Sequence, residues 1–162
     1  MLFKNLAIAE QENDTLISQH FIRVIINIGL KRGVRQGDTI SPKLFAATLQ
    51  NVMRTLEWEN MGVKIDGWQL HHLRFADDIV LIAPNISQAK RILADFDRAC
   101  GKIGFQPNLT KTVFMKNGLV SHAPFTLNGT NISECSSDVY LGREINMMND
   151  LAPELCRRKR AT

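Results

Sequence analysis

The sequence predicts an α+β fold, and three kinds of pattern support this prediction. Runs rich in β-branched residues, the clearest being 21–30 (FIRVIINIGL), are typical of strands. Two other segments repeat apolar residues every three or four positions, which is typical of amphipathic helices. Short apolar runs flank turn residues, as in β-hairpins. The chain has 162 residues, 44% of them hydrophobic and 22% charged, so its size and composition fit one globular domain with a buried core.

Two helices are expected in the middle of the chain, the first over 42–57 and the second from Ser87 to Gly104. Ser41 and Ser87 are the expected N-caps, because a serine hydroxyl accepts a hydrogen bond from the first turn of a helix. The apolar face of the first helix comprises Phe45, Leu49, Val52 and Leu56. That of the second comprises Ile92, Phe96, Cys100 and Ile103. A further helix is expected to start near Pro153.

Several strands and hairpins are expected in the chain from residue 21 onward. The first strand, 21–30, is expected to break near Asn27 or Gly29, because both residue types favour turns. The other expected strands are 63–65, 73–76, 79–83, 113–115, 125–127, 131–132 and 139–145.

Asp77 and Asp78 lie between the apolar runs 73–76 and 79–83, which suggests a tight hairpin with two carboxylates at its tip. Two interpretations are open. Asp is common in turns, so the pair fits an ordinary acidic turn that Arg74 partly neutralises. Alternatively, adjacent carboxylates beside apolar strands need a compensating cation, and a turn can aim both of them at one divalent metal ion.

Segment 32–42 (RGVRQGDTISP) joins the first strand to the first helix. Its two glycines permit close approach of a ligand, and its arginine and glutamine side chains supply hydrogen-bond donors. The loop precedes a helix N-terminus, where phosphate is favoured. A flexible loop before a capped helix explains the same residues, so both interpretations stay open.

The charge, the cysteine content and the lack of long apolar runs indicate which partners and which cellular compartment fit this sequence. The net charge of +4 and the pI near 9.2 are compatible with a polyanionic partner but do not require one. The basic run 157–160 fits a solvated helix end, a phosphate contact or a nuclear-import signal. Three widely spaced cysteines indicate neither a disulfide framework nor a zinc site. Because the sequence shows neither a membrane span nor a signal peptide, we expect an intracellular protein of the cytoplasm or nucleus, without membrane association.

Four segments stand in a distinctive order along the chain. They are RGVRQGD at 32–38 with SP at 41–42, FADD at 75–78, NLTKT at 108–112 and YLG at 140–142. Together they resemble the reverse transcriptases of non-LTR (LINE-like) retrotransposons, especially the RTE-type members, over about residues 20–146. The resemblance implies a polymerase palm, an antiparallel sheet backed by helices, here without the fingers, the first catalytic strand and the thumb.

The resemblance also implies an activity and a set of site residues. The activity is RNA-directed DNA polymerisation, in which nucleotides are added to a primer 3′ end by a two-metal mechanism. The implied substrates are an RNA template, a DNA primer and deoxynucleoside triphosphates, and the implied cofactor is Mg²⁺, with Mn²⁺ as a substitute. Asp77 and Asp78 are the implied metal ligands, and Lys111 the charge partner or proton donor near the triphosphate. The implied nucleotide and template contacts are Arg35, Gln36, Gly37 and Phe75. The implied primer contacts are Tyr140, Leu141 and Gly142.

The sequence departs from the family pattern in its first part. A palm of this family needs a third carboxylate on an apolar strand that precedes Gln36. The only acids there are Glu10, Glu12 and Asp14, and their surroundings are polar. We therefore expect an internal portion, or a degenerate copy, of a larger polymerase that is inactive alone; the alternative is a non-catalytic nucleic-acid-binding remnant. The expected domains are an irregular segment 1–20, a partial palm 21–148 and a C-terminal helix start with a basic tail 149–162.

Overall fold

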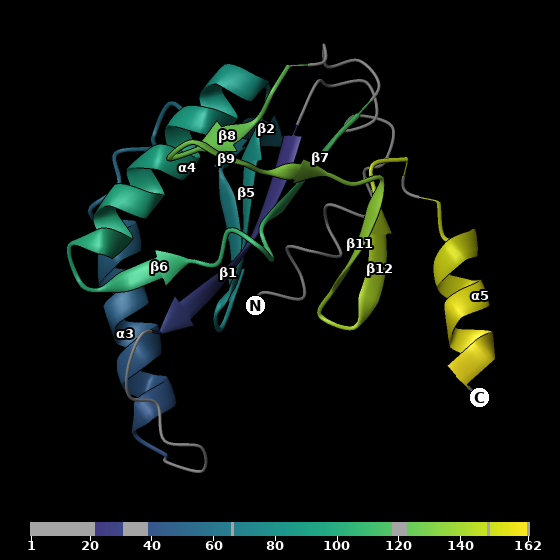
Figure 1. Cartoon of the computed structure of the whole chain (residues 1–162), viewed down its shortest axis with the longest axis horizontal. Coiled ribbons are helices and arrows are strands. Elements are labelled where there is room, and N and C mark those ends of the chain that lie inside the picture. Colours follow the sequence, from purple (N-terminus) through teal and green to yellow (C-terminus); the bar gives the residue numbers. More distant parts are fainter. Residues whose placement is uncertain (1–21, 31–38, 66, 118–122, 149, 162) are drawn as a thin grey trace.

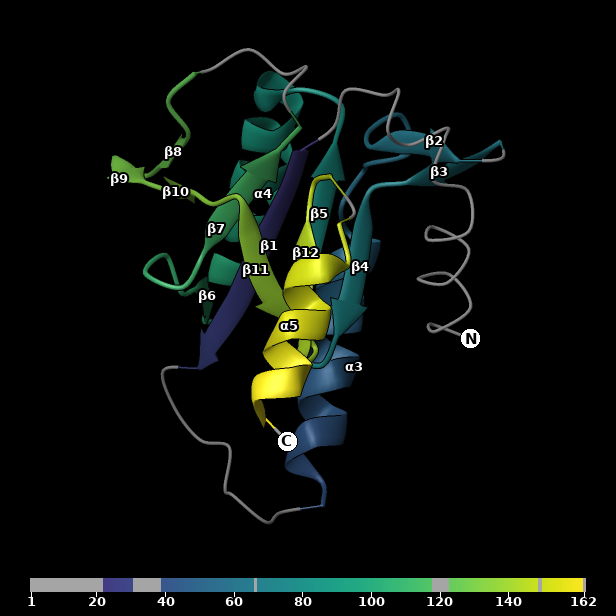
Figure 2. The same ribbon diagram turned by 90° about the vertical axis from the view of Figure 1, so that its right-hand side faces the viewer.

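The computed structural model describes residues 22–30, 39–65, 67–117, 123–148 and 150–161. Within them the chain forms a six-stranded sheet with helices on one face and a β-hairpin followed by a helix on the other (Figures 1 and 2). None of the helices in this part of the chain is long and apolar enough to cross a membrane. The predicted α+β class, a sheet backed by helices, is confirmed.

The central strand of the sheet is β1 (Ile22–Leu30). One edge of β1 pairs antiparallel with β5, while the other pairs antiparallel with β7 and then with β6. The predicted break in this strand is wrong. Asn27 still pairs with β5, and Gly29 pairs with β6, so the strand continues through both residues. The other strands of the sheet are β4 (His72–Phe75), β5 (Asp78–Ala83), β6 (Phe105–Pro107), β7 (Val113–Lys116) and β10 (Ser133–Glu134).

The helices are α3 (Ser41–Arg54), α4 (Ile86–Gly101) and α5 (Ala152–Ala161). Their positions match the predictions, but both predicted serine caps are wrong. Ile40 is already in a helical conformation and its carbonyl accepts from the Leu44 N–H at 3.0 Å, so Ser41 lies inside α3. Asn85, in extended backbone, caps α4 by accepting from the Gln88 N–H at 2.8 Å.

Three small hairpins complete the described fold. They are β2 (Val63–Ile65) with β3 (Trp68–Leu70), β8 (Thr126–Leu127) with β9 (Thr130–Asn131), and β11 (Ser137–Tyr140) with β12 (Arg143–Asn146). The last hairpin corrects the prediction of one strand over 139–145. Leu141 and Gly142 both have positive φ, 52° and 77°, and form a two-residue turn that reverses the chain.

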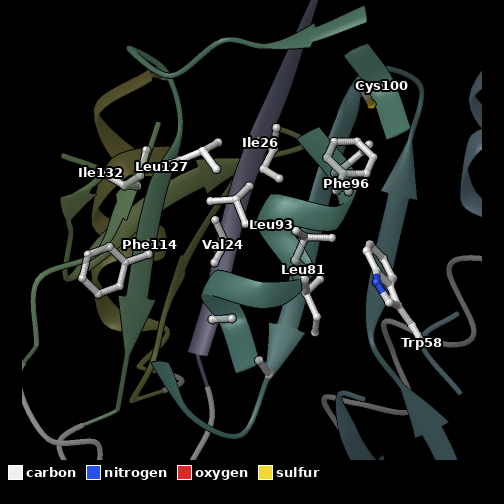
Figure 3. Packing of buried hydrophobic residues seen from close by; sticks show 14 of the residues in the cluster. Val24, Ile26, Trp58, Leu81, Leu93, Phe96, Cys100, Phe114, Leu127 and Ile132 are labelled. Carbon is white, nitrogen blue, oxygen red and sulfur yellow. The ribbon is translucent and has the colours of Figure 1, made fainter. Parts of the chain in front are cut away.

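Within the described residues, apolar side chains pack on both faces of the sheet. The larger cluster lies between the sheet and the helices α3 and α4, and includes Phe96, Leu93, Leu81 and Trp58 (Figure 3). The smaller cluster lies on the opposite face, where Tyr140 of β11 packs with Ile25, Val80, Ile82 and Met115. Alternate residues of β1 contribute to both clusters, as the two-residue period of a strand requires.

Candidate active site

The acidic pair lies at the tip of the β4–β5 hairpin, as the sequence predicts. Phe75 pairs with Asp78, so the turn consists of Ala76 and Asp77, one residue earlier than expected. Ala76 has a φ of 52°, a left-handed conformation that costs a non-glycine residue about 1–2 kcal/mol. The Ile28 N–H donates to the Asp77 carbonyl at 3.2 Å, so β1 anchors this strained turn.

The two carboxylates differ in their surroundings. Asp77 is exposed and Asp78 is half-buried. By strand alternation Asp78 is on the same face of β5 as Val80, which packs in the smaller cluster. Phe75, which pairs with Asp78, is 47% exposed. The hairpin tip therefore presents the Asp78 carboxylate and an accessible aromatic ring on the sheet face that faces β11 and β12, and Asp77 lies in the exposed turn next to them.

Tyr140 links the β11–β12 hairpin to the acidic pair. Its side chain is only 7% exposed and packs in the smaller cluster. Burial, and then the nearby negative charge of Asp78, raise the pKa of Tyr140 to about 12. The phenol therefore stays protonated at neutral pH. Leu141, which follows it in the turn, is 42% exposed. The structure thus brings a predicted primer contact beside a predicted metal ligand.

Lys111 lies in a turn that Asn108 organises. The Asn108 carbonyl accepts from the Lys111 N–H at 3.0 Å and from the Thr112 N–H and hydroxyl, both at 2.9 Å. Thr112 is buried, whereas Lys111 is exposed. Asn108 and Thr112 therefore form a scaffold that holds Lys111 outward, a structural role that the sequence motif alone did not reveal.

The register of the sheet places the Lys111 turn at the same end as the acidic pair. Val113, the first residue of β7, pairs with Ile25 of β1, and Asp78 pairs with Asn27, two residues further along β1. Figures 1 and 2 show the β4–β5 turn, the β11–β12 turn and the start of β7 toward the lower end of the sheet. β1 separates β5 from β7, so two strand spacings, roughly 10 Å, lie between the two strands.

The position of Arg74 does not support the interpretation that it partly neutralises the acidic turn. Alternation along β4 places it on the face opposite Phe75, toward α3. Its Nη2 donates to Gln50 Oε1 of α3 at 2.8 Å. Arg74 therefore ties the hairpin to the helix on the far face of the sheet, and its observed partner is an amide instead of the acidic pair.

The remaining predicted contacts, Arg35, Gln36 and Gly37, lie outside the described residues. Among the residues described, no group of three or more His, Cys, Asp or Glu side chains is placed to hold a metal ion. Asp77 and Asp78 supply oxygen donors of the type that hard divalent ions prefer. The donor type thus fits such an ion, but these two carboxylates alone are too few for a two-metal centre.

The fold and the site together define the palm of a nucleic-acid polymerase, with paired carboxylates at a hairpin tip in a sheet backed by helices. The family model for reverse transcriptase (RNA-dependent DNA polymerase) matches residues 13–145. The chain belongs to this family.

Three relatives from mobile elements agree with this assignment. A transposon-derived protein of Caenorhabditis elegans is 36% identical over 103 residues, which cover 61% of this chain and 37% of that protein. The retrovirus-related Pol polyprotein of the type-1 retrotransposable element R2 of Nasonia vitripennis is 31% identical, over 64% of this chain and 11% of the polyprotein. The Pol polyprotein of the type-2 element R2DM of Drosophila melanogaster is 44% identical over 52 residues, 32% of this chain and 5% of that polyprotein.

The chain therefore spans little more than a third of the first relative and far less of the two polyproteins. The predicted resemblance to non-LTR reverse transcriptases is confirmed. Assignment to the RTE type stays a prediction. Members of this family generally use divalent metal ions and act on nucleic-acid template, primer and nucleotides.

Proposed function

We propose that this chain is the palm portion of an RNA-directed DNA polymerase, which extends a DNA primer on an RNA template. The observation that carries the proposal is the convergence at one end of the sheet of the acidic pair, Tyr140 and the Lys111 turn. These three elements come from separate parts of the chain. Their convergence is what a nucleotidyl-transfer site needs, because metal ligands, a cationic group and a primer-binding surface must face one reacting centre.

Each residue has a role that the family resemblance implies, and its surroundings in the structure are compatible with that role. Asp77 and Asp78 would hold Mg²⁺, or Mn²⁺ in its place. When bound, the ions would stabilise the attacking and leaving oxygens and activate the primer 3′ hydroxyl. Lys111 is exposed and can approach the triphosphate as a charge partner or proton donor. Phe75 offers an accessible ring for a base or sugar of the nucleotide or template.

The hairpin turn Tyr140–Gly142 would seat the primer. Tyr140 is buried against the sheet, and Leu141, which follows it in the turn, presents an exposed apolar side chain. Arg35, Gln36 and Gly37 would contact the incoming nucleotide and template, as the family resemblance implies.

We further propose that the chain alone has little or no polymerase activity. The strands on either side of Asp78 in the sheet are β1 (IRVIINIGL) and β4 (HLRF), and neither carries an acidic residue. A carboxylate that shares metal ions with Asp78 would have to come from a nearby strand. Loss of metal-ion stabilisation is worth several kcal/mol, and each ~1.4 kcal/mol is a tenfold change in rate.

A primer-extension assay tests the last proposal directly. The purified chain, incubated with Mg²⁺, a labelled primer on a homopolymer RNA template and the matching triphosphate, is expected to give no product above background. Incorporation that Asp77→Asn abolishes would show that the site is complete.

Metal binding at the hairpin tip tests the site assignment without requiring turnover. Because paramagnetic Mn²⁺ broadens nearby NMR signals, we expect it to broaden the backbone amides of residues 75–79 selectively. Asp77→Asn should remove this broadening. Asp95→Asn is the matched control, because Asp95 lies on α4 and pairs with the exposed Arg98 at 3.3 Å. Equal broadening in the unaltered chain and in Asp77→Asn would contradict the assignment.

The alternative, nucleic-acid binding without catalysis, is favoured by the absence of acids on the strands that flank Asp78. It predicts salt-dependent binding to primer–template that Asp77→Asn leaves unchanged and Arg35→Ala weakens. Loss of binding in Asp77→Asn would instead favour a metal-organised site.

A further inference from the structure

The C-terminal helix α5 is attached to the β11–β12 hairpin through Glu154. Among the described side chains of α5, Glu154 alone is buried, at 4% exposed. Its Oε2 accepts from the backbone N–H of Glu144 in β12 at 2.8 Å and from Arg157 Nε at 2.9 Å. Its Oε1 accepts from Arg157 Nη2 at 3.0 Å and from Arg158 Nε. One carboxylate therefore joins the helix to the strand.

The charge state of Glu154 follows from these donors. Hydrogen bonds from Arg157, then from the Glu144 N–H and from Arg158, lower the pKa of Glu154 to about 2. The carboxylate is therefore ionised at neutral pH. A buried ionised group is tolerated only with such partners, because its hydration has been lost.

Apolar packing does little to hold α5. Leu151 and Leu155, one helical turn apart, are 49% and 58% exposed, and Met148 before them is 77% exposed. The sheet side of the hairpin, in contrast, is buried through Tyr140. The attachment of α5 to the hairpin thus depends mainly on polar contacts. Besides those of Glu154, Asn146 of β12 donates through Nδ2 to the Asp150 carbonyl at 2.7 Å and accepts through Oδ1 from the Asp150 N–H at 2.9 Å, just before α5.

Arg157 extends this contact to the tip of the hairpin. The Nη2 atom that donates to Glu154 also donates to the carbonyl oxygen of Gly142. Gly142 and Leu141 form the turn with positive φ at both positions, and Leu141 is a residue type that adopts this conformation reluctantly. A hydrogen bond from outside the hairpin therefore favours the observed turn. Figure 2 shows α5 in front of β12, with the turn beside it.

We propose that Glu154 and Arg157 are positioning residues, which hold the Leu141–Gly142 turn in the place where it meets the primer. This inference rests on the proposed function, because the turn matters to activity only if it seats the primer. It adds that the start of the C-terminal helix and the primer-binding turn form one unit, in which Glu154 connects α5 to strand β12 and Arg157 connects α5 to the turn.

The test uses the whole chain with four substitutions, Glu154→Ala, Arg157→Ala, Arg157→Lys and Arg98→Ala. The first readout is hydrogen exchange of the Glu144 amide by NMR, which follows the connection itself. The second is the Kd for a labelled primer–template hybrid, measured by fluorescence anisotropy in Mg²⁺. Arg98→Ala removes one positive charge on α4, where the arginine side chain is 71% exposed, and is the control for charge loss.

We expect Glu154→Ala and Arg157→Ala to speed exchange of the Glu144 amide at least tenfold and to raise the Kd about fivefold or more. Arg157→Lys keeps the charge but lacks the planar fork that reaches carboxylate and carbonyl together, so its Kd should be close to that of Arg157→Ala. Arg98→Ala should change neither readout appreciably.

Three results would overturn the inference. Unchanged exchange in Glu154→Ala would show that the carboxylate does not hold the hairpin. Faster exchange with an unchanged Kd would show that the position of the turn does not matter to the primer. A normal Kd in Arg157→Lys would assign the effect to charge alone. If the unaltered chain fails to bind primer–template, the proposed function fails as well, and the exchange data then still report separately on the connection.

Discussion

At the scale of single residues, His71 and His72, at the end of β4 away from the acidic tip, show how burial changes the charge of a side chain. Their rings stack with centroids 4.7 Å apart, and their Nδ1 atoms are 2.7 Å apart. Trp58 contacts both rings edge-on, at 5.7 and 6.1 Å between centroids. Burial, and then the charges of His71 and Arg74, lower the pKa of His72 to about 4. His72 is therefore neutral at physiological pH.

This lowered pKa predicts a pH dependence of stability. In the unfolded chain His72 regains its ordinary pKa of about 6.5, so between about pH 6.5 and pH 4 the unfolded state binds the proton more tightly. The free energy of unfolding should therefore fall as the pH is lowered through this range. We expect His72→Gln to reduce the fall, measured by urea unfolding at several pH values. His71→Gln should retain most of it, because burial is the main cause. Identical pH profiles for His72→Gln and the unaltered chain would contradict the assignment.

The sequence provides candidate site residues where chemistry restricts the residue type, and its structural predictions were wrong where geometry selects among similar residues. Adjacent carboxylates, a lysine in NLTKT and a tyrosine in YLG are distinctive in the sequence. Helix capping is not, because Asn85 and Ser87 are both good caps and only the extended backbone at Asn85 selects it. The pairing of Glu154 with Arg157 and Arg158 has helical spacing in the sequence, but its contact with β12 is visible only in the structure.

At the scale of elements, the β2–β3 hairpin is attached to α4 through Gly62. The Gly62 N–H donates to Gln88 Oε1 at 2.7 Å. A Cβ atom on Gly62 would lie 2.2 Å from the backbone oxygen of Leu70, and Gly62 also has a φ of 87°. Gly67, in the turn of the same hairpin, has a φ of 80°, but a Cβ there meets no atom of the described residues within 4 Å. The two glycines therefore differ in steric contact and not in backbone conformation.

This difference predicts unequal effects of the same substitution. Gly67→Ala should cost about 1–2 kcal/mol, the cost of a left-handed alanine. Gly62→Ala should cost at least about 3 kcal/mol, because the backbone of Leu70 must also move. Chemical unfolding of both variants measures the free energies. Equal costs would show that the backbone conformation, and not the close approach of β3, determines the need for glycine.

Elements were predictable where their pattern was unambiguous. β2 has the predicted bounds, and α3 and α4 lie where the apolar periodicity placed them. The β11–β12 hairpin was missed because leucine is an uncommon residue at positive φ, so Leu141 and Gly142 looked like the continuation of a strand. Ile103, predicted on the face of α4, lies beyond its end and is 40% exposed, because the helix stops at Gly101.

At the scale of the whole molecule, β1 joins the two sides of the described fold. Ile22, Val24, Ile26 and Ile28 are buried in the cluster beneath α3 and α4, and Ile25 in the cluster beneath the β11–β12 hairpin. Adjacent residues of β1 belong to different clusters. Unfolding of β1 would therefore remove buried side chains from both clusters at once. The topology therefore favours cooperative unfolding of the described part as one unit.

Phe96→Ala tests this coupling. Phe96 is fully buried in the larger cluster, and removing such a ring costs about 3–5 kcal/mol, a large part of the roughly 5–15 kcal/mol typical of a domain. The sequence has two tryptophans, so Trp58 fluorescence is measured in a background in which the exposed Trp68 is replaced by Phe, and it then reports on that cluster. ¹⁹F-labelled Tyr140, the only tyrosine in the sequence, reports on the other. We expect both probes to shift to lower denaturant concentration by the same amount. Leu155→Ala, at a 58% exposed position of α5, should change stability by no more than about 0.5 kcal/mol. If Tyr140 kept its midpoint while Trp58 shifted, the faces would unfold separately, and β1 would not couple the hydrophobic core to the side of the sheet that carries the acidic pair.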